Sequence, residues 1–182
     1  MNLKTVLSQK EDVILKRWIN TVLDTYHPDT KKFLQRNHDP FTNPVGHTLI
    51  KETRNLFREL LNSQDTESDR LASILDRIIR VRAIQDFSPS QSISFLFTLK
   101  AVVEDEAASE LQDREQWDDL LKFEEKIDKA ALIAFDIYME CREKIYEITA
   151  DHAKNQVSSL LRKTGLISEI PEWDPLKKEE KP

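Results

Sequence analysis

Two sharp helix starts, each an Asn or Ser followed by proline, constrain the fold of this chain more than any other feature. They read N-P-V-G from Asn43 and S-P-S-Q from Ser88. Proline suits the first position of a helix because its missing N–H would have no partner there, and Asn and Ser side chains accept bonds from the free amides that follow. Only two glycines and seven prolines punctuate 182 residues, so we expect long helices.

Apolar residues recur every three or four positions along most of the chain, which is the period of an amphipathic helix. A capping-box pattern at Ser8 and Glu11 predicts a further helix start. No strand pattern and no repeat appear, so the fold class is all-α, a compact helical bundle. The expected helices cover about residues 9–26, 29–36, 44–61, 71–84, 89–103 and 113–163.

The last of these helices sets the domain organisation. Fifty helical residues would extend about 75 Å, against a radius of gyration of about 16 Å for a domain of this size. We therefore expect a kink near 149–152 or a protruding end, with Gly165 as the C-terminal cap. The predicted parts are a helical domain over 1–148, a helix extension over 149–166 and a flexible charged tail over 167–182.

Charge and composition exclude several functional classes. The net charge is −6, from 33 acidic and 27 basic side chains that are interspersed, which argues against a nucleic-acid-binding face. The single cysteine rules out an intramolecular disulfide and suits a reducing compartment. No run approaches the about 20 apolar residues needed to span a bilayer, and the N-terminus lacks a secretory signal pattern. We expect a cytoplasmic protein without direct membrane insertion.

The corner between the fourth and fifth long helical patterns is the best candidate for a ligand or partner site. Arginines end one helix where the free amides of the next begin, and both features favour anions. A structural interpretation competes with this one, because Arg also complements a helix C-terminus, Asp86 can pair with Arg82, and Ser88 is used as a cap. The candidate residues are Arg80, Arg82, Gln85, Asp86, Ser88, Ser90 and Gln91, beside the structural motif Asn43, Pro44, Gly46, Phe87 and Pro89.

Neither a metal, a haem nor a catalytic centre is indicated. No two histidines have the i, i+4 spacing of a helical metal site, and no Cys lies near His38 or His47. No histidine sits in the middle of an apolar helix, as a haem ligand would. Cys141 falls on an apolar stripe and is expected to be a buried structural residue. We therefore predict no cofactor and no enzyme activity.

The apolar stripe of the long last helix is open to two interpretations. Steps of three and four residues suit both an intramolecular core and the seam of a homodimer. The second half, from Ile148 to Leu161, outruns the expected domain and is the favoured partner surface. The candidate seam residues are Tyr138, Cys141, Ile145 and Ile148.

Several segments together resemble the N-terminal domain of RsbRD-type RsbT co-antagonists, which are stressosome sensor proteins. They are W-I-N-T-V-L-D-T-Y from Trp18, D-P-F-T-N-P-V-G from Asp39, R-V-R-A-I-Q-D-F-S-P-S-Q from Arg80, L-K at Leu99, and F-D-I-Y-M-E-C-R-E-K-I-Y-E from Phe135. The resemblance covers roughly residues 10–148 and implies a sensory or dimerising helical module, globin-like without haem. Related proteins continue into a STAS output domain, but only residues 164–182, 19 in all, follow Lys163 here. We expect a standalone module.

The resulting functional hypothesis is a non-enzymatic bacterial signalling sensor or scaffold that acts through self-association and contact with another regulatory protein. A small-molecule carrier or sensor for an apolar or anionic ligand is the alternative, with Phe33, Phe57, Phe95 and Phe97 lining an apolar cavity. A third hypothesis is an adaptor for a membrane redox or signalling complex, which would use the tail around Trp173.

Overall fold

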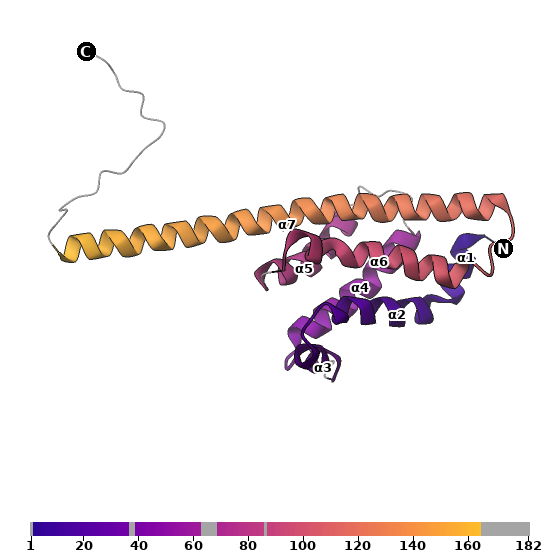
Figure 1. Ribbon diagram of the computed structural model, residues 1–182, viewed down its shortest axis with the longest axis horizontal. Helices are drawn as coiled ribbons and strands as arrows, with labels where there is room; N and C mark the ends of the chain where they lie inside the picture. Colours follow the sequence, from indigo (N-terminus) through magenta and orange to yellow (C-terminus); the bar gives the residue numbers. More distant parts are fainter. Residues whose placement is uncertain (1, 37–38, 63–68, 86, 165–182) are drawn as a thin grey trace, which may run out of the picture. The chain divides into compact units, whose positions relative to one another are not determined.

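A computed structural model describes residues 2–36, 39–62, 69–85 and 87–164, and within these ranges it contains helices and no strand. The predicted all-α bundle with a long C-terminal helix is therefore confirmed (Figure 1). Whether the bundle is globin-like stays a prediction. The helices are α1 (Leu3–Gln9), α2 (Glu11–Asp24), α3 (Pro28–Arg36), α4 (Pro44–Asn62), α5 (Asp69–Ile84), α6 (Pro89–Ala107) and α7 (Arg114–Lys163).

One of the three predicted caps is wrong. The chain is already helical at Ser8, because α1 starts at Leu3 with Asn2 as its cap, whose side chain accepts the amide of Thr5. The cap position of α2 is Lys10, which makes no side-chain capping bond. At α6, by contrast, Ser88 and Gln91 form the predicted reciprocal box. Local patterns thus located the proline-marked starts better than the start without proline.

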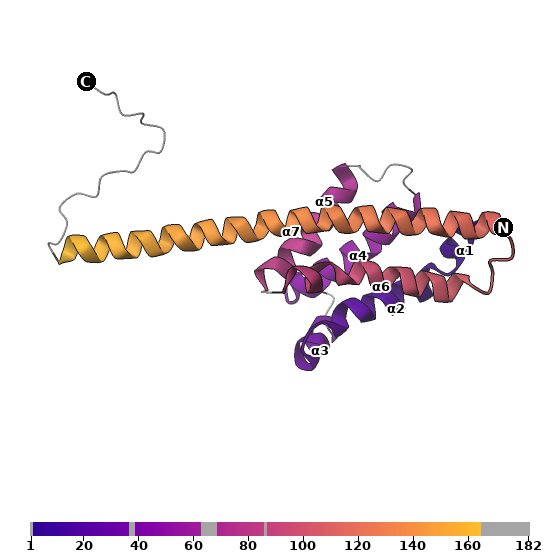
Figure 2. The ribbon, with the colours of Figure 1, turned by 45° about the horizontal axis from the view of Figure 1, so that its top comes forward.

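The core lies where two helix pairs and the first part of α7 meet. Helices α2 and α6 lie side by side (Figures 1 and 2), and α4 packs against α5. Side chains of α7 reach all three neighbouring helices. Phe123 meets Phe57 of α4 edge to face at 6.5 Å between ring centroids, Lys100 of α6 pairs with Asp128 at 2.6 Å, and Arg142 donates to the Ala83 carbonyl of α5 at 3.2 Å.

The Asn43 motif fastens α3 to the start of α4. Asn43 is fully buried, and its Oδ1 accepts the amide of Gly46 at 2.9 Å, which is the predicted cap. Its Nδ2 donates to the Leu34 carbonyl at 3.0 Å at the end of α3. A Cβ on residue 46 would lie only 2.3 Å from this Nδ2. The chain therefore needs glycine here because the capping side chain occupies the space of a methyl group, while Pro44 occupies the first helical position.

Gly46→Ala should destabilise the protein by about 1–3 kcal/mol, since Asn43 must move and leave buried polar atoms without partners. In an ordinary helix interior the same change would be stabilising by up to about 1 kcal/mol. Urea unfolding followed by circular dichroism measures the difference. The double variant Gly46→Ala/Asn43→Ala should lose little more than Gly46→Ala alone, because both changes remove the same bonds. Additive losses would contradict this account of the glycine.

By the contacts between its residues, the chain divides into two units, Met1–Arg142 and Glu143–Pro182. Helix α7 is a single helix through 149–152, where a kink was one of the two expectations. The domain boundary predicted at residue 148 stays a prediction, and the cap predicted at Gly165 lies outside the described residues. None of the described helices combines the length and the apolar character required to cross a membrane.

Candidate functional site

The two arginines of the predicted corner lie in opposite environments. Arg80 is exposed, and its Nε donates to both carboxylate oxygens of Asp76 at 2.7 Å, one helical turn away. Arg82 is fully buried, and its Nη2 donates to the Gln91 carbonyl at 2.8 Å and to Thr25 Oγ1 at 3.2 Å. The two guanidinium groups therefore have separate partners, and the anion or partner site at this corner stays a prediction.

Arg82 is enclosed by aromatic rings. Its guanidinium carbon lies 4.4 Å from the centroid of Phe87, 5.6 Å from that of Phe95 and 5.8 Å from that of Tyr26. Burial lowers the pKa of Arg82, and the Tyr26 hydroxyl opposes this effect. Burial likewise raises the pKa of Tyr26. Nε and Nη1 of Arg82 have no hydrogen-bond partner among the described residues, so the rings supply much of the stabilisation of this cation.

The other described corner residues make contacts with one another or with Tyr26, which follows the end of α2. Gln85 accepts the Tyr26 hydroxyl at 2.9 Å, Ser90 lies 3.2 Å from the Ser88 hydroxyl, and Gln91 is used in the capping box. Asp86, including its predicted pairing with Arg82, lies outside the described residues. These contacts fit the structural interpretation that the sequence left open, in which the corner locks α5 to α6.

The four residues of the predicted dimer seam differ in how far they are buried. Tyr138 and Cys141 are buried in the first unit, and the Tyr138 hydroxyl donates to the Phe87 carbonyl at 2.6 Å. Burial raises the pKa of the Cys141 thiol, as expected of a structural cysteine. Ile145 is half-buried, while Ile148 is 59% exposed. Tyr138 and Cys141 are therefore covered by their own chain, and their place in a homodimer seam stays a prediction.

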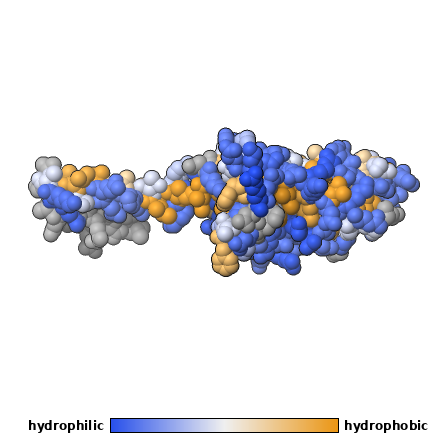
Figure 3. Space-filling view, turned by 90° about the horizontal axis from the view of Figure 1, so that it is seen from below, coloured by the Kyte–Doolittle hydropathy of each residue, from blue (hydrophilic) through white to orange (hydrophobic). Residues whose placement is uncertain are grey.

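Exposed apolar side chains occupy other positions of α7. In the first unit they include Leu132, Phe135 and Met139, spaced three and four residues apart. In the second unit Tyr146, Val157 and Leu160 are 60%, 55% and 61% exposed. Figure 3 shows apolar surface between polar side chains on the part of α7 that belongs to the second unit. The sequence favoured 148–161 as the partner surface, and the exposed Val157 and Leu160 lie within that segment. That this surface meets a partner stays a prediction.

The aromatic cavity of the carrier hypothesis does not form. Phe33 and Phe97 are 55% and 46% exposed, whereas Phe57 and Phe95 are buried. Phe95 stacks on Trp18 at 6.1 Å between centroids, and Phe57 packs against Phe123. The four rings thus belong to two core contacts and two surface positions, and they line no common pocket.

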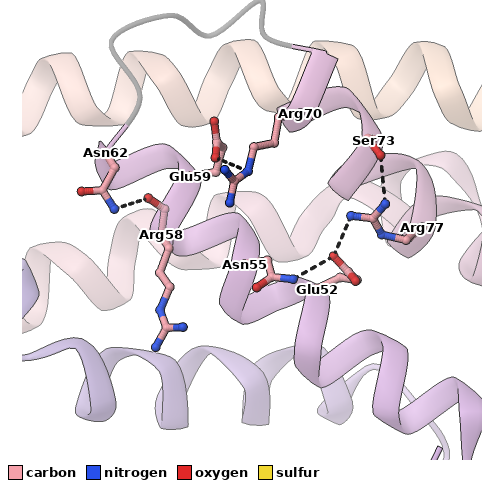
Figure 4. Close-up of polar contacts among 8 residues, drawn as sticks. All are labelled: Glu52, Asn55, Arg58, Glu59, Asn62, Arg70, Ser73 and Arg77. Carbon is pink, nitrogen blue, oxygen red and sulfur yellow. Dashed lines mark hydrogen bonds and ion pairs between the residues drawn. The ribbon is translucent and has the colours of Figure 1, made fainter.

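Ion pairs join α4 to α5 on the side shown in Figure 4. Glu52 is buried, and it accepts Arg77 Nη2 at 3.1 Å and Asn55 Nδ2 at 3.2 Å. Arg70 bonds Glu59 at 3.0 Å further along the same pair of helices. Both arginines of α5 in this view have a carboxylate partner from α4, so these contacts complete the pairing of the two helices.

Within the described ranges, no three His, Cys, Asp or Glu side chains converge as they would to hold a metal ion. His47 lines a groove on α4, and His152 lies in the second unit. His38 and the tail with Trp173 lie outside the described residues. The tail-dependent adaptor hypothesis stays a prediction.

Comparison with known proteins identifies the family to which this chain is similar. The family model described as "RsbT co-antagonist protein rsbRD N-terminal domain" matches residues 12–152. An uncharacterized protein of Archaeoglobus fulgidus is 35% identical over 89 residues, which is 48% of this chain and 55% of the relative. The aligned part thus spans about half the length of that curated relative. No solved structure matches the chain.

Proposed function

This chain belongs to the family of RsbRD N-terminal domains, and from that premise we propose that it is a non-enzymatic regulatory module of bacterial stress signalling. It self-associates through α7 and passes its state to another regulatory protein in the cytoplasm. The observation that carries the proposal is the row of exposed apolar residues in the second unit. Contiguous exposed apolar surface on a soluble protein typically marks an interaction site.

The row has the spacing of a coiled-coil seam. Tyr146, Ala150, Ala153, Val157 and Leu160 follow one another in steps of four, three, four and three residues. All five are exposed in the single chain. In a coiled coil such positions insert between those of a facing helix, and the small residues at the centre permit a close approach.

A second copy of the chain fits this row better than an unrelated helix. In an antiparallel pair centred on Ala150 and Ala153, Tyr146 of one copy lies opposite Val157 of the other. Glu147 and Lys154 flank the row on the same side, so each would face its opposite charge across the pair. Glu147 also pairs with Lys144 of its own chain at 2.9 Å, an exposed contact worth little. One segment therefore supplies both halves of a self-complementary seam.

Val157→Glu/Leu160→Glu tests the proposal by size-exclusion chromatography with multi-angle light scattering. We expect the wild type to run as a dimer at micromolar concentration, and the variant to have a dissociation constant at least about thirtyfold higher, or about 2 kcal/mol, because two charges would enter an apolar seam. Both positions are exposed in the single chain, so the fold of the first unit should be unchanged by circular dichroism.

The matched control is Ser159→Glu/Arg162→Glu, which alters exposed polar positions of the same helix outside the row. This variant should keep the wild-type mass. A monomeric wild type, or equal dissociation of both variants, would overturn self-association through this row.

A further inference from the structure

We propose that a groove along α4 binds a small organic or inorganic polyanion, a compound carrying two or more carboxylate or phosphate groups. This inference rests on the proposed regulatory function, for which the polyanion would be the input signal. The groove has a volume of about 530 Å³, within the range of pockets that hold small molecules. Its lining residues are His47, Ile50, Lys51, Arg54, Asn55 and Arg58.

The charge of the groove is opposite to that of the protein. The chain carries a net charge of −6, yet four of the six lining side chains are basic or histidine, and none is acidic. Lys51 and Arg54 make no ion pair or hydrogen bond with another described side chain. Arg58 extends away from α5 in Figure 4, and its Nε bonds Glu11 of α2 at 2.7 Å. This contact fixes one cation at the end of the groove.

The row of basic residues destabilises α4, the helix that carries it. Lys51 and Arg54 are three residues apart and Arg54 and Arg58 are four apart, so like charges are neighbours on one face. Such pairs destabilise a helix by about 0.2–0.5 kcal/mol each. At three places with the same spacings, by contrast, this chain places opposite charges together: Asp76 with Arg80, Asp119 with Lys122, and Lys144 with Glu147.

The geometry defines the class of ligand. Side chains three and four residues apart on a helix have Cβ atoms about 5–6 Å apart, and Lys51 to Arg58 spans about 10 Å along the axis. A monoanion would engage one cation, whereas a compact polyanion reaches two or three. Arg can bind carboxylate or phosphate through two parallel hydrogen bonds, and the half-buried Ile50 and Asn55 offer apolar and amide contacts beside the charges.

Isothermal titration calorimetry of the full chain with citrate and, separately, with pyrophosphate tests the site. Acetate serves as the single-charge probe, and sodium chloride matches the ionic strength. We expect at least one of the two polyanions to bind the wild type and acetate to give no saturable heat. In Lys51→Gln/Arg54→Gln the dissociation constant should rise at least about tenfold, because two charge-assisted contacts are lost.

The control is Arg114→Gln/Lys129→Gln, which removes one arginine and one lysine that are exposed on α7 and without a partner among the described residues. It has the same net charge as the test variant and should bind like the wild type. Binding of citrate alone would indicate a carboxylate ligand, and binding of pyrophosphate alone a phosphate ligand.

Absence of binding to both polyanions, or equal weakening in both variants, would overturn the site. The result is separable from that of the light-scattering experiment, because the groove is formed by one chain within the first unit. A monomeric wild type that binds citrate would reject self-association and keep the groove.

Discussion

Tyr138→Glu should destabilise the first unit by more than about 4 kcal/mol, whereas Tyr146→Glu should change its stability by less than about 0.5 kcal/mol. The two tyrosines lie eight residues apart on α7, but Tyr138 is 4% and Tyr146 is 60% exposed. Loss of a buried aromatic ring alone costs about 3–5 kcal/mol. A carboxylate in the same place adds a desolvation penalty, and the Phe87 carbonyl loses the hydroxyl that now donates to it at 2.6 Å.

Chemical unfolding followed by circular dichroism measures the stability of Tyr138→Glu. Light scattering measures the mass of Tyr146→Glu in solution. Under the proposed function Tyr146→Glu is folded and impaired in self-association, while Tyr138→Glu fails to fold before association becomes relevant. Tyr138→Phe separates the ring from its hydroxyl, and it should cost only about 1–3 kcal/mol because one buried acceptor loses a partner. A stable, monomeric Tyr138→Glu protein would restore Tyr138 to the interface.

The sequence located the apolar character of α7 but left open which of its faces is covered. Ile127, Ala131 and Ala134 lie on the apolar stripe of this helix, and all three are buried. Leu121 follows the same spacing of three and four residues but is 58% exposed. A helix with apolar residues on two sides satisfies the 3.6-residue period in more than one way, and only the positions of α4, α5 and α6 select the covered side.

At the two proline-marked junctions, the caps could be predicted from the sequence, but the burial of one arginine could not. The caps at Asn43 and Ser88 depend on residues within three positions, and sequence patterns contain that information. The burial of Arg82 depends on Tyr26, Phe87 and Phe95, which come from separate parts of the chain. An arginine near a helix C-terminus is ordinarily solvated, so nothing local distinguished the buried Arg82 from the exposed Arg80.

The basic row of α4 was overlooked for a different reason. Its spacing was visible in the sequence, but interspersed charges elsewhere made it resemble an ordinary solvated helix face. What distinguishes the row is the absence of carboxylate partners for Lys51 and Arg54 among the described residues, together with the hollow beside them. Both are properties of side chains in three dimensions. The i, i+3 and i, i+4 repetition of cations on one face of the predicted helix is the signal that could have found it.

Trp18→Ala should lower the free energy of unfolding by about 3–5 kcal/mol, a large share of the about 5–15 kcal/mol that stabilises a typical domain. Trp18 is fully buried between α2 and α6, and its ring lies at 21° to that of Phe95 with centroids 6.1 Å apart. The indole Nε1 donates to the Phe95 carbonyl at 2.6 Å. The variant loses this bond and leaves a cavity that the bundle can close only in part.

Trp117→Ala is the matched control, since this tryptophan is 41% exposed and its loss should cost less than about 1 kcal/mol. Urea unfolding monitored by circular dichroism compares the two without relying on tryptophan fluorescence. Trp18→Phe should fall between them, because a ring remains while the indole N–H is lost; the Phe95 carbonyl keeps the Thr98 hydroxyl, which donates to it at 2.8 Å. Equal losses for Trp18→Ala and Trp117→Ala would mean that the α2–α6 contact does not hold the bundle together. The regulatory proposal would then lack the rigid first unit on which the α4 groove depends.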